Sequence, residues 1–201
     1  MRRAQLFAKL ITKHKSSLNM IIENRAERIK SALEPLVEDL LAAGVRLNSE
    51  RSMHFLFAED YPIGLPIILS HLERPYEDLP KSIIAGALYY TKNKHSQAIW
   101  PEIADIYSKT PNMAKLFDKP SLQPIPSAFK SSLANALLKL YEPKRLSSLV
   151  HLVCDKRNGE TRIILLKPLI RVQKRRKKVA ELLADLKSDP MLATELAARG
   201  I

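Results

Sequence analysis

The feature that most constrains the fold is a helical pattern that occurs three times along the chain. The three segments align so that their Ala-Leu or Pro-Leu pairs coincide, with offsets of 49 and 32 residues. Apolar residues three and four positions apart are typical of a helix with one buried face. A single helical hairpin cannot bury such a face, so repetition at this spacing predicts a stack of neighbouring hairpins. The segments are SIIAGALYY (82–90), SSLANALLKL (131–140) and RIILLKPLIRV (162–172).

Further segments with the same apolar spacing end in polar or proline-containing turns, and they predict the first helix of each hairpin. Aligned positions lie on the face that neighbouring hairpins share, so the alignment also predicts which side chains are buried. The predicted first helices cover residues 66–73, 101–108, 147–154 and 178–185. The residues predicted to be buried are Ala87, Leu88, Ala136, Leu137 and Leu169.

The chain before residue 58 has a different pattern. Apolar residues from Ile22 to Leu40 alternate steps of four and three, which is typical of a helix seam. Pro35 interrupts the seam, so we expect a kink or a new helix near it, ending at Gly44. A cap on the open end of the hairpin stack is the simplest role for this region. The first 22 residues carry five cations and no acid, which would also suit a transit peptide or a membrane-surface helix.

The net charge of +12 is unevenly distributed along the chain. Residues 1–30 carry eight Lys or Arg against two acids, and residues 111–201 carry eighteen against eight. Residues 31–110 carry seven against eleven. Basic ends favour an anionic partner, such as an acidic protein, a nucleic acid or a lipid headgroup surface, although charged runs also serve simply to solvate helix surfaces.

Two further features of the sequence concern where in a cell the protein would be found. The longest apolar run is IILL (163–166), far short of the roughly 20 residues that span a bilayer, so we expect no transmembrane segment. Cys154 is the only cysteine, which excludes an intrachain disulfide and suits a reducing, cytoplasmic location. We expect its side chain to be a small buried apolar group.

Several residues of the hairpin unit resemble a HEAT repeat. Pro66 and Pro101 stand at the proline position of the first helix, Asp155 at the acidic turn position and Arg162 at the basic position that opens the second helix. The stretch 155–172 is particularly similar to small bacterial HEAT-repeat proteins. The resemblance implies an all-α, right-handed superhelical solenoid whose second helices line the concave face. The predicted domains are a basic N-terminal helical extension or cap over residues 1–57 and a HEAT-like repeat array over residues 58–201.

The repeat alignment places cations at equivalent positions. Lys81, Lys130 and Arg162 lie near the start of successive second helices, and Lys139 and Arg171 lie near the ends of the last two. Neighbouring helices pack roughly 8–10 Å apart, so these residues would form a ladder that could bind a partner on the concave face. The alternative is structural, because a cation at this position can bond the carboxylate of a nearby turn. Asp78 and Asp155 are the acids that this alternative would use.

A second basic feature is the run KRRKK, formed by Lys174, Arg175, Arg176, Lys177 and Lys178. We expect it in the turn after the last aligned helix, where it would project from an edge of the stack. Such a run binds phosphates without reading sequence, but it is not interleaved with the aromatic residues that stack on single-stranded bases. The alternative is a solvated turn without a ligand.

Residues for catalysis, metal binding or cofactor binding are not arranged in any recognisable motif. The histidines are isolated, and no glycine-rich phosphate loop is present. His71 and His151 are both expected to be satisfied packing residues, and His151 with Cys154 forms only a weak candidate for a nucleophile and base. A HEAT-like DNA glycosylase would rely on exposed aromatics, whereas Trp100 stands at a position that is normally core. We therefore expect no enzyme, no metal and no cofactor.

The sequence predicts a binding protein. The favoured function is non-enzymatic recognition of an acidic protein partner, as an adaptor or as a toxin-neutralising immunity-type protein. The alternative is a nucleic-acid-binding HEAT-like protein that uses the concave ladder and the run at 174–178.

Overall fold

The computed structural model describes residues 23–47, 61–89, 93–114 and 125–201. Within these ranges almost all regular structure is helical, and the two strands that occur are two residues long. The predicted all-α class is therefore confirmed. The basic segment 1–22, for which a cap, a transit peptide and a membrane-surface helix were considered, lies outside the described residues.

The helices occur in pairs that follow one another along the chain. An N-terminal helix over residues 23–42 precedes them. The antiparallel strands β1 (Met113–Ala114) and β2 (Ile125–Pro126) join α4 to α5. The α-helices are α2 (Tyr61–Glu73), α3 (Asp78–Leu88), α4 (Asn93–Lys109), α5 (Ala128–Lys139), α6 (Leu146–Cys154), α7 (Arg162–Val172), α8 (Lys177–Asp185) and α9 (Pro190–Ala198). The short 3-10 helices are η1 (Pro143–Arg145), η2 (Lys156–Thr161), η3 (Gln173–Arg175) and η4 (Leu186–Ser188).

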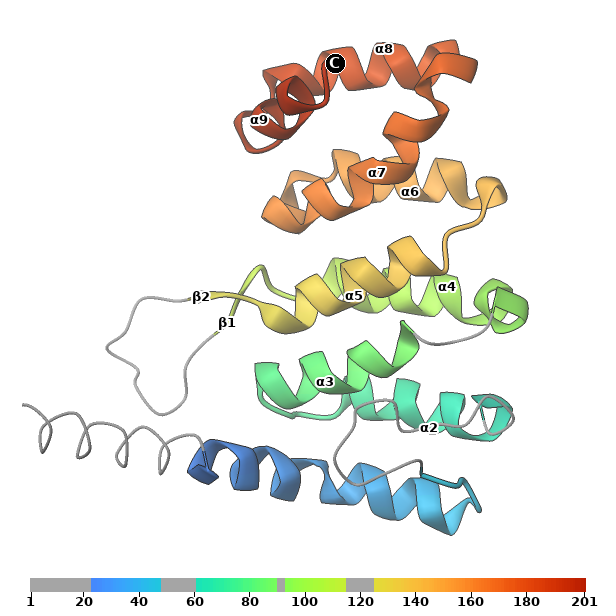
Figure 1. Ribbon diagram of the computed structural model, residues 1–201, viewed down its shortest axis with the longest axis vertical. Helices are drawn as coiled ribbons and strands as arrows, with labels where there is room; N and C mark the ends of the chain where they lie inside the picture. The colour runs from blue at the N-terminus through green and yellow to red at the C-terminus, as the bar shows by residue number, and fades with distance from the viewer. Residues whose placement is uncertain (1–22, 48–60, 90–92, 115–124) are drawn as a thin grey trace, which may run out of the picture.

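The helix pairs are layered one above another along the long axis of the molecule (Figure 1). Helices α3, α5 and α7 form one row, in which α5 packs against both of the others. The five core residues predicted from the alignment are all buried, and Leu88, Ala136, Leu137 and Leu169 are fully inaccessible. The alignment of the repeats is thus confirmed at the level of the core.

Prolines lie inside several helices without ending them. Pro66 lies within α2 and Pro101 within α4, and both side chains are exposed. The N-terminal helix likewise continues through Pro35, so of the two predicted alternatives, a kink or a new helix, the new helix is wrong. Proline removes the hydrogen bond to the carbonyl four residues earlier, but on an exposed helix face water can solvate that carbonyl.

The N-terminal helix shares its core with α2. Leu33, Leu36 and Leu40 belong to the same cluster of buried side chains as Ile68 and Leu72. The described part of the predicted extension is therefore continuous with the core of the first helix pair.

A buried histidine reinforces this contact. The His71 Nε2–H donates to Asp39 Oδ2 at 2.9 Å, and His71 Nδ1 lies 2.7 Å from the Tyr76 hydroxyl. Arg74 donates to the same Asp39 oxygen at 2.7 Å. Hydrogen bonds from His71 and Arg74 lower the pKa of Asp39. Both ring nitrogens of His71 are bonded and its side chain is buried, so the prediction of a satisfied packing residue is confirmed. The same prediction for His151 is wrong, because His151 is exposed on α6, whose buried positions are Leu149, Leu152 and Val153.

Polar side chains also join the starts of α3 and α5. Asp78 Oδ1 accepts a hydrogen bond from Ser127 Oγ at 2.5 Å, and Asp78 Oδ2 accepts one from the Ala128 amide at 2.9 Å. Ser127 in turn caps α5, since its Oγ accepts from the Lys130 amide. The first turn of α5 is therefore held to the first turn of α3, and these contacts set the position of the side chains that follow.

Candidate functional site

Lys130, the central residue of the predicted ladder, is buried. Its side chain is 1% exposed, its Nζ donates to Thr110 O at 2.7 Å, and it lies 4.9 Å from the centroid of the Tyr107 ring. Burial lowers the pKa of Lys130 to about 8, and the nearby charge of Asp155 only partly opposes this. The start of α5 lies against the end of α4, so this lysine points into the protein and not toward a partner.

Arg162 is buried as well, in an ion pair. Its Nη1 lies 2.8 Å from Asp189 Oδ2, and its Nε donates to Gly159 O at 2.9 Å. The structural alternative named Asp155 as the partner, but Asp155 accepts hydrogen bonds from Arg157. Asp189, which caps α9, takes its place, so the bond links one hairpin to the next.

Lys81 lies partly buried at the start of α3. Its Nζ lies 5.4 Å from the centroid of the Phe129 ring, and burial lowers its pKa. Lys130 and Arg162 are buried and bonded within the protein, so the predicted ladder of three cations does not form a continuous exposed surface. This prediction is corrected by the structure, because cations at equivalent positions of the repeats have different tertiary neighbours.

The two cations predicted near the helix ends are exposed. Lys139 ends α5 and lies 5.3 Å from the centroid of the Tyr89 ring, whereas Arg171 lies in the last turn of α7. Arg171 belongs to a larger set of exposed cations, which we call the basic edge. It extends over α7, η3 and the start of α8. The basic edge consists of Lys167, Arg171, Lys174, Arg175, Arg176, Lys177 and Lys178.

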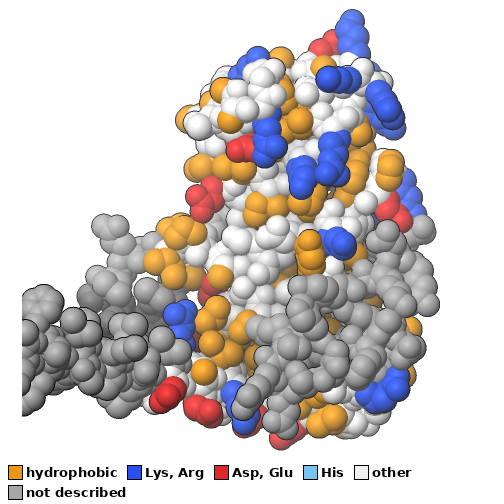
Figure 2. Space-filling model, in the orientation of Figure 1, with side chains coloured by type: hydrophobic (Ala, Val, Ile, Leu, Met, Phe, Trp, Pro, Cys, Tyr) orange, Lys and Arg blue, Asp and Glu red, His pale blue; other side chains and the backbone are white. Residues whose placement is uncertain are grey.

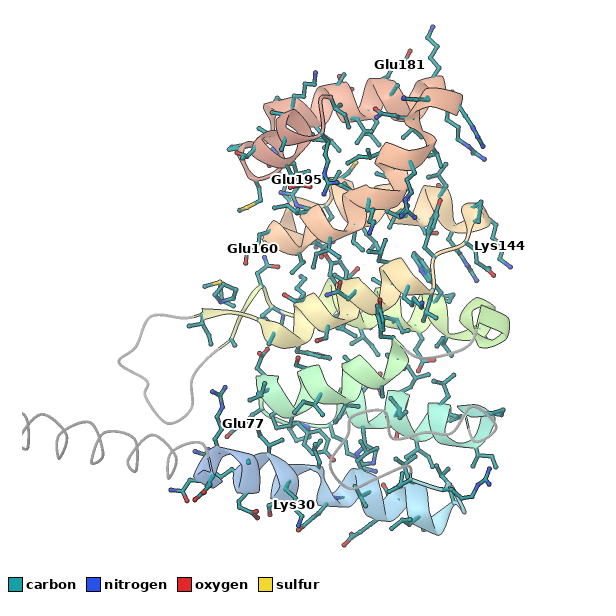
Figure 3. The ribbon with its side chains drawn as sticks, in the orientation of Figure 1. Lys30, Glu77, Lys144, Glu160, Glu181 and Glu195 are labelled. Atoms are coloured by element: carbon teal, nitrogen blue, oxygen red, sulfur yellow. The ribbon has the colours of Figure 1, made fainter. Side chains whose placement is uncertain are left out.

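The predicted placement of the run at 174–178 is confirmed, since η3 and the first turn of α8 carry it between two hairpins. Figure 2 shows Lys and Arg gathered on the upper part of the molecule, over α7 and α8. Figure 3 shows Glu77 and Glu160 along one edge of the stack and Lys144 along the other. The turns between hairpins form that second edge, where the basic edge also lies (Figure 1).

Most cations of the basic edge lack a carboxylate partner. Among the described residues, the one ion pair they form is Lys177 with Glu181, at 3.8 Å and largely exposed. Elsewhere on the described surface, several basic side chains are neutralised locally, as in Lys109 with Asp105, Arg157 with Asp155 and Arg199 with Glu195. Exposed lysines that form no ion pair with a described residue also occur there, but they are scattered: Lys30, Lys139, Lys156 and Lys187. The basic edge is thus the place on the described surface where unpaired cations are neighbours in the sequence.

Apolar side chains accompany this charge on α7. Ile163, Ile164 and Ile170 are partly exposed and lie on the same helix face as Lys167 and Arg171, as their spacing of three and four residues requires. The opposite face carries the buried residues Leu165, Leu166 and Leu169. The exposed face of α7 therefore combines apolar and cationic side chains.

A groove lies near the other edge of the stack, between the first two hairpins. Its volume is about 530 Å³, and it is open to solvent on one side. Its walls are mostly apolar and are formed by Leu72, Tyr76, Ile106, Met113 and Phe129. Lys81 lies on its wall, and Lys109 and Asp105 lie on its rim. No sequence pattern indicated this groove, because its lining comes from the ends of five elements.

The candidate catalytic residues differ in their exposure to solvent. Cys154 is exposed at the end of α6, so the expectation of a buried side chain is wrong; Leu149, Leu152 and Val153 fill the core instead. Partial desolvation raises the pKa of the Cys154 thiol, which disfavours a reactive thiolate. Trp100 is buried and donates from Nε1 to Leu137 O at 3.2 Å. In the described part of the chain, no group of three acidic, histidine or cysteine side chains could hold a metal ion.

Across the described ranges, no helix combines the length and the apolar character needed to cross a membrane. In comparisons with known proteins, no family model, no curated protein and no solved structure matches this chain.

Proposed function

We propose that this protein is a HEAT-like, right-handed superhelical solenoid that recognises an acidic protein partner without catalysis. The partner binds across the exposed face of α7 and the basic edge. Adaptor and toxin-neutralising immunity-type roles both use binding of this kind. The layered helix pairs and the buried residues at aligned positions support the solenoid.

The main support for this binding surface is the unpaired positive charge of the basic edge. Six of its seven cations form no ion pair with a described residue, while cations elsewhere on the surface are commonly paired. Charge of one sign over one area steers oppositely charged molecules and accelerates their association. An acidic surface would supply the missing carboxylates.

The isoleucines of α7 favour a protein over a nucleic acid. Ile163, Ile164 and Ile170 place apolar surface directly beside Lys167 and Arg171. A protein interface combines an apolar centre with a polar rim, whereas phosphate backbones are contacted by cations and hydrogen-bond donors. The basic edge contains no aromatic residue on which an unpaired base could stack.

The test compares two probes, a peptide of alternating glutamate and leucine and a short DNA duplex, by fluorescence anisotropy over a range of salt concentrations. K174Q/R175Q/R176Q should weaken binding of the peptide. The matched control K109Q/R157Q/R199Q removes the same charge from paired positions and should have little effect. Ile164→Ser should weaken binding of the peptide and leave any binding of the DNA duplex unchanged.

The nucleic-acid alternative gives a different result. Affinity for the duplex would be high at physiological salt and would fall with a slope of about −0.9 per phosphate neutralised. The triple variant would flatten that slope, and Ile164→Ser would have no effect on either probe. That combination would refute the protein-partner proposal.

A further inference from the structure

The groove between the first two hairpins contains one cation without a carboxylate partner. Lys81 lies on its wall, partly buried, and its ammonium group lies 5.4 Å from the centroid of the Phe129 ring. Lys81 forms no ion pair with a described residue, and partial burial lowers its pKa. Partial desolvation of a charge costs free energy that a ligand anion would recover.

Two of the carboxylates that line the groove are already engaged. Asp78 accepts hydrogen bonds from Ser127 and Ala128, and Asp105 is paired with Lys109. Glu73 also lines the groove, and its charge helps to raise the pKa of Lys109. The lining holds three acids and two cations, so its net charge favours no anion, and a ligand carboxylate would gain only from direct contact with Lys81. A ligand with several negative charges would be repelled by the excess acid.

The remaining lining is mostly apolar. Side chains of Leu72, Tyr76, Ile106, Met113 and Phe129 line it, and Met113 is 46% exposed. The volume of about 530 Å³ is within the range of roughly 300–1,000 Å³ that is usual for small-molecule sites. A ligand for this groove therefore needs an apolar body and a single anionic group.

We propose that the groove binds a small amphipathic monocarboxylate, with the carboxylate at Lys81 and the aliphatic chain against Leu72, Ile106 and Met113. The site is separate from the basic edge and does not depend on the function proposed for that surface.

An extended peptide suits the groove less well. Thr110 O already accepts from Lys130 Nζ, and Asn112 O accepts from the Ser127 amide. These carbonyls beside the β1–β2 pair are therefore not available for main-chain hydrogen bonds, which supply most of the affinity when a peptide adds to a strand. A small ligand needs only the cation and the apolar walls.

The test uses octanoate as the probe, with octanol and octylammonium as its neutral and cationic counterparts. Methionine methyl NMR reports the position of binding, because Met113 lines the groove and Met191 lies on α9. Octanoate should shift the Met113 methyl signal and leave the Met191 signal in place. Octanol should bind about tenfold more weakly, since its neutral hydroxyl accepts a hydrogen bond from Lys81 without the negative charge of a carboxylate. Octylammonium should bind more weakly still, because its charge has the same sign as that of Lys81. Lengthening the acid should strengthen binding by up to about fourfold per methylene group.

Substitutions of Lys81 test whether this lysine binds the carboxylate of octanoate. Lys81→Gln should lower the affinity for octanoate about tenfold and leave the affinity for octanol unchanged. Lys81→Arg, which keeps the positive charge, should retain most of the octanoate affinity of the unmodified protein. Lys144→Gln, whose lysine is paired with Glu142 on the opposite edge, is the matched control and should leave octanoate binding unchanged. The proposal is wrong if Met113 does not respond to octanoate, or if octanol and octanoate bind equally in the unmodified protein. K174Q/R175Q/R176Q should not alter octanoate binding, which separates this result from that of the basic edge.

Discussion

Arg162 and Asp189 form a buried ion pair that joins two consecutive helix pairs. Their side chains are 3% and 7% exposed, and Arg162 Nη1 lies 2.8 Å from Asp189 Oδ2. Arg162 opens α7 and Asp189 caps α9, so one bond connects the N-terminal ends of two neighbouring second helices. The contact between Asp78 and the first turn of α5 has the same position between the first two hairpins. Polar side chains thus join these hairpins at equivalent ends.

Arg162→Ala should destabilise the protein by about 3–5 kcal/mol, because it leaves the Asp189 carboxylate buried without its partner. Urea unfolding measures this change, and Lys177→Ala, which removes a largely exposed pair, should change stability by less than about 0.5 kcal/mol.

The same pair predicts a dependence on pH. The hydrogen bonds from Arg162 lower the folded-state pKa of Asp189 below its unfolded value. The pair therefore contributes fully above the unfolded pKa of Asp, near 4, and its contribution is lost as the pH falls through the folded pKa. The acid limb of the stability profile should be shallower in Arg162→Ala, and an unchanged limb would contradict this assignment.

Lys130 should make stability rise with pH in the alkaline range. Its folded pKa is about 8, below the usual value of 10.5, so the unfolded chain binds more protons between these values. The free energy of unfolding should therefore increase from about pH 8 upward, by at most about 3 kcal/mol in total. Lys130→Met should remove this increase, and Lys139→Met, at an exposed position, should retain it. Denaturant unfolding at pH 7, 8, 9 and 10 gives the comparison, and parallel profiles for the protein and Lys130→Met would contradict it.

Gly159→Ala should be strongly destabilising. Gly159 has φ +61° and ψ −148°, a conformation that is essentially restricted to glycine and costs other residues about 1–3 kcal/mol. An added Cβ would also lie 2.7 Å from the Asn112 side chain, which donates to Arg157 O. Gly86→Ala is the matched control, since its Cβ would meet open space within α3 and should stabilise the protein by up to about 1 kcal/mol. Equal thermal shifts for the two variants would show that the turn does not require glycine.

Asp39→Ala should loosen the N-terminal helix from α2. It removes the acceptor of His71 Nε2 and of Arg74, and it leaves the buried ring nitrogen unpaired. The folded pKa of Asp39 is lowered, so its contribution is present above pH 4 and is lost as the pH falls through the folded value. Hydrogen exchange should accelerate in residues 23–42 while α5 and α7 remain protected. Uniform acceleration would indicate global unfolding instead.

The repeats were predictable because they are encoded locally. Apolar residues three and four apart define a helix face in any environment, and repetition of that face predicts from the sequence alone that Ala136 and Leu137 are buried. The alignment also predicted that the run at 174–178 lies in a turn, because a turn must separate the last aligned helix from the next one.

Tertiary structure decided what each cation does. Lys130 and Arg162 occupy equivalent positions of the repeat, yet one donates to Thr110 O and the other to Asp189. These partners lie 20 and 27 residues away, and their approach depends on how neighbouring helices pack.

The sequence by itself determined the helical repeats, their buried face and the basic run between two hairpins, because each depends on spacing along a single helix or turn. Tertiary structure alone decided that two predicted binding cations are buried, that Cys154 is exposed and that a groove forms beside Lys81. Burial of a polar side chain depends on partners that only folding brings within hydrogen-bonding distance, and no local pattern records their positions.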